Sequence, residues 1–296
     1  MSTKGFLINQ VSPWLPYPLV MGMGIGLHYL MLHFGFELTA ATYIPVIFGA
    51  AAITFLELHY PQRKEWLANS NDILNDSAYM VVVQVVLPRI LSFALAITLL
   101  SYLKIRNMTF ETWWPYDWPV VMQAILMILS ADFLRYWLHR FSHEWPLLWR
   151  LHAVHHSPHK LYWVNVARFH PIEKALQYLF DALPFIVLGV AEEVLALYFV
   201  FYSINGFFQH CNIKLRLGYL NYIVSGPELH RWHHSMVAKE SNQNYGNNLI
   251  VWDLLFGTWF LPKEKQVDLL GLTNRKYPMP FISQLKTPFV KGIEQE

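Results

Sequence analysis

Four long, mainly apolar stretches constrain the fold of this chain more than any other feature. Residues 19–36 and 38–56 contain no Asp, Glu, Lys or Arg, and a single residue separates them. A helix needs about 20 apolar residues to cross the hydrocarbon core of a bilayer, so we expect a tight pair of membrane-spanning helices here. Residues 78–103 and 118–138 predict two further spans. We expect the first of these to kink at Pro88, because proline removes a backbone hydrogen bond.

The composition indicates a largely lipid-facing surface. Charged residues make up 14% of the chain, whereas soluble domains carry about 25%. Residues 182–204 contain two apolar runs separated by Glu192 and Glu193, and each run is too short to cross a bilayer alone. We interpret this segment as a re-entrant or strongly tilted hairpin with the two glutamates at its tip, near water or headgroups. The net charge of +2 gives no argument for nucleic acid binding, and the single cysteine, Cys211, excludes an intrachain disulfide framework.

Counting the spans assigns the remaining segments to the two sides of the membrane. Four crossings and a returning hairpin put the N-terminus, residues 57–77 and everything after residue 138 on one side, with residue 107 on the other. Basic residues concentrate in residues 61–66 and in the C-terminal segment, so the positive-inside rule makes the shared side cytoplasmic.

The predicted fold class is therefore all-α. We expect an integral-membrane helical bundle of about four transmembrane helices plus a re-entrant hairpin, with a cytoplasmic helical cap that carries most of the histidines. The chain is interpreted as one membrane domain over residues 1–296, divided into a mainly transmembrane region (1–138), a histidine-rich catalytic region (139–262) that includes the hairpin 182–204, and a C-terminal tail (263–296).

Eleven of the fourteen histidines lie between residues 139 and 234. They include three boxes, "HRFSH", "HAVHH" and "HRWHH". Each box holds two imidazoles one helical turn apart, which is the spacing at which one helix can chelate a metal ion. The predicted topology puts all three boxes on one side of the membrane, where they can meet. The box histidines are His139, His143, His152, His155, His156, His230, His233 and His234. We expect structural roles for His28, His33 and His59.

Eight box histidines exceed the four ligands of one structural zinc site, so the ligand number favours two metal ions. Imidazole suits iron, copper, nickel and zinc, and the spacing alone leaves the metal open. A histidine-lined metal transporter is one alternative, although its ligands would lie mid-span along a path. A b-type cytochrome is another, although it would need only a few paired histidines.

The order of the boxes, HxxxH, HxxHH and HxxHH, resembles the fatty acid hydroxylase/sterol desaturase superfamily of integral-membrane, non-haem di-iron oxygenases. The resemblance covers about 130 residues in the family's order: "DFLRYWLHRFSH" (132–143), "WRLHAVHHSP" (149–158), "RFHPIE" (168–173), "FFQHCN" (207–212) and "NYGNNLIVWDLLFGTWFLP" (244–262). It implies that the eight box histidines are catalytic iron ligands. His170 and His210 match positions where the family often carries further ligands. Some members carry a histidine four residues before the position of His210, where this chain has Gly206.

The resemblance implies a membrane-bound lipid hydroxylase with two iron ions and with O₂ as co-substrate. The alternatives are a lipid or sterol desaturase on the same centre and, less in keeping with the boxes, a metal-binding or transport protein. The chain has no GxGxxG fingerprint and no cytochrome-like haem domain, so we expect a separate electron donor of the cytochrome b5, ferredoxin or reduced-pterin type. We expect a multi-pass protein of a bacterial inner membrane or endoplasmic reticulum that takes its lipid from the bilayer. The sequence does not select the lipid.

Several polar residues near the boxes have two interpretations. Asp132 could orient a ligand imidazole or pair with Arg135 at i, i+3. His159 follows Pro158, which should end the helix of the second box, so we expect a supporting or surface role. Asn244, Asn247 and Asn248 could form a turn or hydrogen-bond the ligands.

Overall fold

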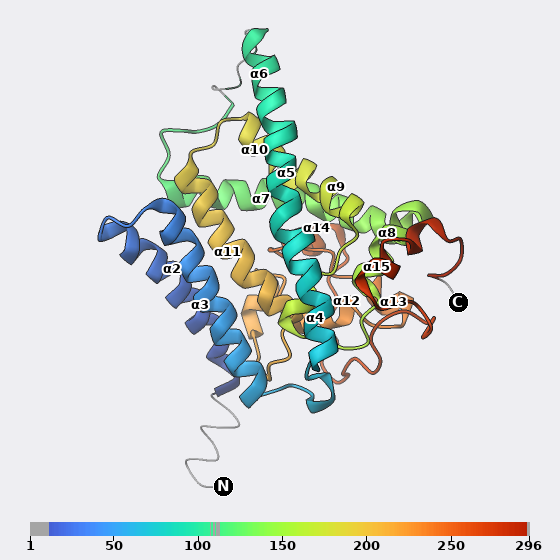
Figure 1. Ribbon diagram of the computed structural model, residues 1–296. Coiled ribbons are helices and arrows are strands. Elements are labelled where there is room, and N and C mark those ends of the chain that lie inside the picture. The colour runs from blue at the N-terminus through green and yellow to red at the C-terminus, as the bar shows by residue number, and fades with distance from the viewer. Residues whose placement is uncertain (1–11, 107, 109, 111–112, 295–296) are drawn as a thin grey trace.

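The computed structural model describes residues 12–106, 108, 110 and 113–294, and it is built of helices (Figure 1). Within these residues the only strand-like pairings are three isolated bridges, which confirms the all-α fold class for this part of the chain. Residue 107, expected on the opposite side of the membrane, lies outside the described residues. The α-helices are α2 (Pro16–His33), α3 (Leu38–His59), α4 (Ser70–Tyr79), α5 (Leu87–Leu91), α6 (Ile97–Ile105), α7 (Val120–Glu144), α8 (Pro146–His156), α9 (Pro171–Asp181), α10 (Leu183–Val187), α11 (Glu192–His210), α12 (Pro227–His233), α13 (Ala238–Ser241), α14 (Val251–Phe256) and α15 (Phe281–Gln284). Short 3₁₀ segments are η2 (Ser12–Trp14), η3 (Lys64–Trp66), η6 (Trp163–Ala167), η7 (Gly218–Tyr222) and η8 (Thr287–Phe289), and π-helical segments are η4 (Met80–Val86) and η5 (Ser92–Ala96).

Four helical stretches in the described residues are long and apolar enough to cross a membrane, as predicted. They are Ser12–His33, Leu38–His59, Ser70–Ile105 and Val120–Glu144. The first two form the expected helical pair and pack together against α11 (Figure 1). This contact is close because Gly24 and Gly49 face Ile204, so that an added Cβ would lie 2.4 Å and 2.8 Å from its side chain. Small residues at these two positions therefore let α11 approach the membrane-spanning pair.

The third span is longer than predicted and continues through Pro88 without a break (Figure 1). The π-helical segments η4 and η5 lie on either side of the short helix that contains Pro88. Their wider turns accommodate the missing proline N–H, so the expected disturbance takes the form of two π-helical segments. Only 11% of the most apolar window of this span is buried, which fits a helix that faces lipid.

The segment 182–204 reverses direction as predicted, but its tip and its end differ from the prediction. Residues 188–191 form the reversal, and Glu192 and Glu193 begin α11. Both glutamates are exposed, and their negative charges stabilise α11 because they lie at the positive, N-terminal end of its helix dipole. α11 extends to His210 and packs against α2, α3 and α7. Whether the hairpin dips into a bilayer stays a prediction.

A buried carboxylate joins the membrane-spanning pair to the histidine-rich region. Glu57, in the last turn of α3, accepts hydrogen bonds from the backbone N–H groups of Trp163 and Asn212, each at 2.8 Å. The C-terminal segment is also attached, because Gln284 Nε2 donates to Ser157 Oγ at 2.8 Å, directly after the second box. The Glu57 contacts hold η6 and the residues after α11 against α3, and the Gln284 contact holds the C-terminal segment against the end of α8.

Candidate metal centre

Nine histidines converge in two groups, in each of which one ring nitrogen per residue lies within 4.8 Å of all the others. The five-histidine group contains His139, His143, His152, His156 and His233, and the four-histidine group contains His155, His210, His230 and His234. All eight box histidines and His210 are therefore brought together, in the two sets that two metal ions would require.

Each HxxHH box contributes to both groups. On α8, His152 and His156 are one turn apart and enter the five-histidine group, whereas His155 enters the four-histidine group. On α12 the assignment is reversed, because the first and last histidines of the box enter the four-histidine group and His233 enters the other. Positions i+3 and i+4 lie on opposite sides of position i around the helix axis, so one helix can serve two adjacent sites. The remaining members come from the last turns of two helices, His139 and His143 from α7 and His210 from α11.

The outward ring nitrogens of most of these histidines are held by acceptors. Three Nδ1 atoms bond backbone oxygens: His139 bonds Tyr245 at 2.8 Å, His155 bonds Arg168 at 3.2 Å, and His233 bonds Gln243 at 2.9 Å. The Nδ1 atom of His152 bonds Glu173 Oε1 at 2.7 Å. Two others bond asparagine side-chain oxygens: His143 bonds Asn242 at 3.0 Å, and His210 bonds Asn165 at 2.7 Å. A carbonyl or amide oxygen can only accept, so Nδ1 carries the proton in five of these rings, and it does so in His152 when Glu173, whose pKa burial raises to about 8, is ionised. The inward Nε2 atom then presents a bare lone pair.

The inward lone pairs form a donor set for a cation. His139 Nε2 lies 3.0 Å from His152 Nε2, although both rings place their proton on Nδ1. His156 Nε2 lies 3.1 Å from the Nε2 atoms of both His152 and His233. Lone pairs at such distances repel each other unless a positive ion lies among them. Imidazole nitrogens without thiolates are suitable ligands for iron, copper, nickel or zinc, so the residues present fit a metal ion.

Burial keeps the imidazoles neutral. It lowers the pKa of His233 to about 4 and that of His210 to about 3. The pKa values of His152, His155 and His156 also lie well below the ordinary histidine value, with burial as the main cause. A histidine must be unprotonated to bind a metal, so these rings are available as ligands at neutral pH.

His170 and His159, in contrast, lie outside both groups. His170 caps α9, since its Nδ1 accepts a hydrogen bond from the Ile172 N–H, and its Nε2 bonds the Leu285 carbonyl at 3.3 Å. With both ring nitrogens engaged there, its predicted role as a metal ligand has no support in this geometry. His159 is exposed beyond the end of α8, as expected from Pro158.

Asp132 has neither of the roles that we expected. Its carboxylate accepts hydrogen bonds from the backbone N–H groups of Asn248 and Leu249 and from the Asn248 side chain. Arg135 pairs instead with Asp181 on α9, at 2.6 Å. Asp132 therefore fixes the loop after the third box to α7, because several N–H groups of that loop converge on one buried carboxylate.

The asparagines of this loop are mainly structural. Asn244 adopts a left-handed backbone conformation with φ of 56°, and its side chain bonds the Leu229 carbonyl and both backbone groups of Phe260. This supports the turn interpretation for Asn244. Asn247 differs, because its side chain lines the cavity described below.

Sequence reasoning missed three side chains that hold the ligand rings: Glu173, Asn165 and Asn242. Glu173 lies on α9, 21 residues after His152 in sequence, and is fully buried against it. The motif "RFHPIE" contains Glu173 and was a signal for it, since a carboxylate commonly accepts the second N–H of a metal-bound histidine. For the two asparagines the sequence offers no comparable signal.

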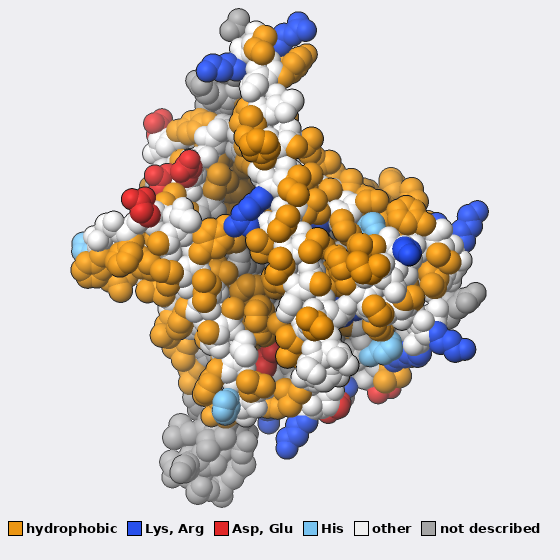
Figure 2. Space-filling view, in the orientation of Figure 1, with side chains coloured by type: hydrophobic (Ala, Val, Ile, Leu, Met, Phe, Trp, Pro, Cys, Tyr) orange, Lys and Arg blue, Asp and Glu red, His pale blue; other side chains and the backbone are white. Residues whose placement is uncertain are grey.

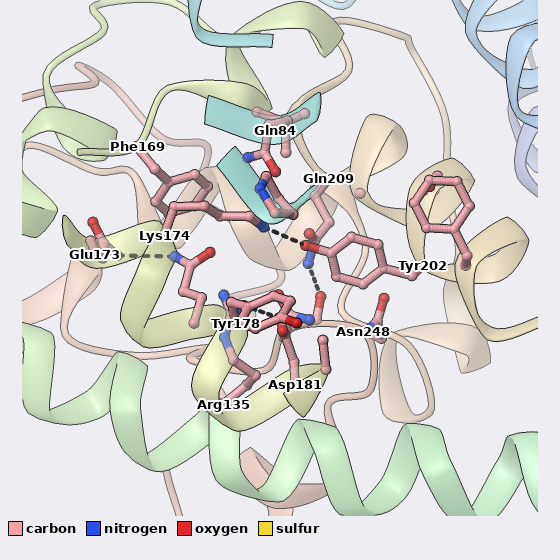
Figure 3. Close-up of a pocket in the computed structure, with 18 of the residues that line it drawn as sticks. Gln84, Arg135, Phe169, Glu173, Lys174, Tyr178, Asp181, Tyr202, Gln209 and Asn248 are labelled. Atoms are coloured by element: carbon pink, nitrogen blue, oxygen red, sulfur yellow. Dashed lines mark hydrogen bonds and ion pairs between the residues drawn. The ribbon is translucent and has the colours of Figure 1, made fainter. Parts of the chain in front are cut away.

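A cavity of about 410 Å³ connects the histidines to the lipid-facing helices. At one end it is lined by Tyr43 and Val85, which are 39% and 40% exposed on α3 and η4. At the other end it reaches members of both histidine groups, namely His139, His152, His155 and His230. Figure 2 shows hydrophobic side chains over most of the face formed by the membrane-spanning helices, and Figure 3 shows polar side chains of α9 and α11 directed into the cavity.

Fold and site together define a membrane protein with two histidine sites for metal beside a cavity that opens among lipid-facing helices. The comparisons with known proteins assign the class more closely. The chain belongs to the fatty acid hydroxylase family, whose profile matches residues 124–258. That region contains all three boxes and His210, so the family resemblance found from the boxes is confirmed.

Relatives of the chain include a hydroxylase, a monooxygenase and a desaturase, which are oxidoreductases. The chain is 35% identical over 250 residues to ornithine lipid hydroxylase OlsE of Rhizobium tropici, covering 83% of this chain and 75% of that protein. It is 32% identical over 163 residues to alkylglycerol monooxygenase of Xenopus tropicalis, covering 55% of this chain and 33% of the relative. A Delta(7)-sterol 5(6)-desaturase of Aspergillus fumigatus is 30% identical over 161 residues, covering 51% and 41%. No solved structure matches the chain.

Proposed function

We propose that this protein is a membrane-bound hydroxylase that inserts one oxygen atom from O₂ into a C–H bond of a bilayer lipid. The observation that carries the proposal is the cavity that begins among lipid-facing helices and ends at both histidine groups. A lipid could enter it sideways from the bilayer and bring a carbon to the metal without passing through water. The second oxygen atom would leave as water, formed with two protons and two electrons from a separate donor.

We infer that the two metal ions are iron. The five-histidine group would hold one ion and the four-histidine group the other. Bound iron would supply the oxygen activation that no amino-acid side chain can perform. The chain's own residues would orient the ligand rings through their Nδ1 bonds, exclude bulk water by burial, and position the lipid in the cavity.

Hydroxylation is proposed ahead of desaturation because of the relatives. The two relatives that are named as a hydroxylase and a monooxygenase cover 83% and 55% of this chain, whereas the named sterol desaturase covers 51%. The electron donor is proposed to be a cytochrome b5, a ferredoxin or a reduced pterin that approaches from the cytoplasmic side. Ornithine lipid, the substrate named for the R. tropici relative, is the first lipid to test.

The proposal is tested by mass spectrometry of lipids from cells that express the protein under ¹⁸O₂. We expect one labelled oxygen atom in a membrane lipid with the wild-type protein and none with His156→Ala. His59→Ala is the matched control, because among the described residues that exposed ring bonds only the Phe55 carbonyl of its own helix. A lipid that gains a double bond without label would establish the desaturase alternative. Absence of any change that depends on His156 would refute oxygen chemistry altogether.

Because the two histidine groups would act as one centre, the effects of their members on turnover should not add. Single changes His139→Ala, His156→Ala and His234→Ala should each abolish most turnover, and a double variant should be hardly worse than a single one. Additive losses would contradict a shared centre.

A further inference from the structure

The helix α9 turns its polar face inward and its apolar face outward. Glu173, Lys174, Gln177 and Asp181 follow one stripe of the helix, and their exposed fractions do not exceed 8%. The outward apolar residues are Ile172, Leu179 and Phe180, which are 46%, 39% and 37% exposed. A helix that packs on an apolar core has the opposite arrangement. The buried polar face instead lines the cavity, together with polar residues of α7 and α11 (Figure 3).

Several polar atoms on this wall have no hydrogen-bond partner within the part of the chain that the structure describes. They are Arg135 Nε, Glu173 Oε2, Gln177 Oε1, Tyr198 OH and Asn247 Nδ2, and all five residues line the cavity. A buried polar atom that lacks a partner costs about 1–3 kcal/mol of stability. So many in one cavity indicate that a polar ligand supplies the missing partners.

Lys174 is the charged group of this wall that lacks an ionic partner. It is 6% exposed, and no carboxylate of the described residues lies within salt-bridge distance of its Nζ. Of the two carboxylates on the same helix, Asp181 pairs with Arg135, and Glu173 bonds His152 through Oε1 and acts on Lys174 only at longer range. The contacts of its ammonium group are a 3.4 Å hydrogen bond to the Tyr202 hydroxyl and the face of that ring, 5.8 Å from the ring centre. A neutral phenol leaves a buried ammonium largely uncompensated, and a buried charge is costly without an opposite one.

The position of Lys174 links it to the metal centre. The adjacent residue, Glu173, holds the ring of His152, and Arg135 lies one helical turn before His139. One turn of helix advances about 5.4 Å. The wall thus adjoins the histidines through Glu173 and Arg135, while the Lys174 ammonium contacts Tyr202, two turns before His210 on α11.

We propose that Lys174 binds the acidic group of the lipid substrate, which makes the substrate a lipid with an acidic headgroup that lies in the cavity lined by the histidines. Gln177 and Asn247 would bond further polar atoms of the same headgroup, and the hydrocarbon chains would extend toward Tyr43 and Val85. This inference deepens the proposed hydroxylase function and rests on it. Lys174 acts here as a specificity-determining residue.

The test is the thermal unfolding of purified protein in neutral detergent with three probes that share one oleoyl chain: N-oleoylglycine (a carboxylate), oleoyl lysophosphatidic acid (a phosphate) and monoolein (neutral). An acidic probe should raise the Tm of the wild-type protein more than monoolein does. Lys174→Met should weaken the apparent affinity for that probe roughly 10- to 100-fold, as expected for the loss of a charged hydrogen bond. Lys174→Arg should keep most of the shift, and Lys276→Met, at an exposed lysine, should keep all of it.

The acidic probe with the Lys174-dependent shift identifies the acid as carboxylate or phosphate. Without probe, Lys174→Met should be at least as stable as the wild-type protein, because it removes an uncompensated buried charge. If Lys174→Met does not fold, Lys174→Gln serves in the same measurement. Acidic probes that act no better than monoolein, or that act equally on the wild-type and Lys174→Met proteins, overturn the proposal. The measurement needs neither O₂ nor an electron donor, so such a result would leave the hydroxylation test unaffected.

Discussion

At the residue scale, the chemistry of the site depends on which nitrogen of each imidazole carries the proton. The acceptors around the groups, three backbone carbonyls and three side-chain oxygens, fix that choice for six of the histidines. His230 and His234 differ, because their Nδ1 atoms have no partner among the described residues. The five-histidine group is thus the more firmly oriented of the two. Its one carboxylate acceptor, Glu173, is the side chain with the strongest expected influence on ligand basicity.

Replacement of Glu173 tests this influence. Glu173→Leu leaves His152 Nδ1 without an acceptor, and we expect metal affinity to fall roughly 10- to 100-fold. Glu173→Gln keeps an acceptor oxygen at the same position and should lose much less. Iron content after a graded chelator challenge measures the difference, with Glu192→Leu, at an exposed glutamate, as the control. Equal iron retention by Glu173→Leu and the wild-type protein would show that this hydrogen bond does not orient the ligand.

At the element scale, metal binding by the boxes could be predicted because helical periodicity places their imidazoles on one face. The division of each HxxHH box between two groups could not be predicted, since it depends on which neighbouring helix faces each side of the row of histidines. The same limit applies to Asp132 and Arg135. Their i, i+3 spacing on α7 permits a pair, but tertiary partners, the loop at Asn248 and Asp181 on α9, displace it.

Gly206 on α11 offers a test at this scale, because it lies one turn before His210 and lines the cavity. An added Cβ there would meet no atom within 4 Å. Gly206→Ala should therefore be tolerated and should stabilise the helix by about 0.5–1 kcal/mol. Gly206→Phe should fill the cavity beside the four-histidine group and lower turnover by roughly tenfold or more, with iron content unchanged. Equal turnover of the Ala and Phe variants would indicate that the substrate does not pass this position.

At the scale of the whole molecule, the spans and the meeting of the boxes could be predicted from the sequence. Apolar length is a property of the local chain, and its consequence for a bilayer is simple. The cavity and its polar wall could not be predicted, because they arise where α9 faces α7 and α11. The amphipathic pattern of α9 does not reveal which face is buried, and the usual assumption would have buried the wrong one. His170 lies outside both histidine groups for a related reason: its place next to Pro171 equally suits a helix cap, and its role as a ligand stays a prediction.

The position of the histidine groups and the basic residues of the chain together predict how the molecule is oriented in its membrane. The histidine groups join residues from both sides of the hairpin 182–204, so Lys160 and Lys239 must lie on one side of the membrane. Basic residues in 61–66 predict that this side is cytoplasmic. Single cysteines at Glu65, Lys160 and Lys239 should react with a membrane-impermeant maleimide in inside-out vesicles only, and one at Met108 should react only in intact cells.

The native Cys211 should give little background in this labelling, because the thiol is buried and burial raises its pKa to about 12. Opposite labelling of Lys160 and Lys239 would be incompatible with the histidine groups themselves. Labelling of both positions from outside would be compatible with the histidine groups but would mean that the molecule has the opposite orientation in the membrane. The electrons would then have to arrive from the non-cytoplasmic side, where soluble cytoplasmic donors cannot reach, and the proposed donor types would fail with the orientation.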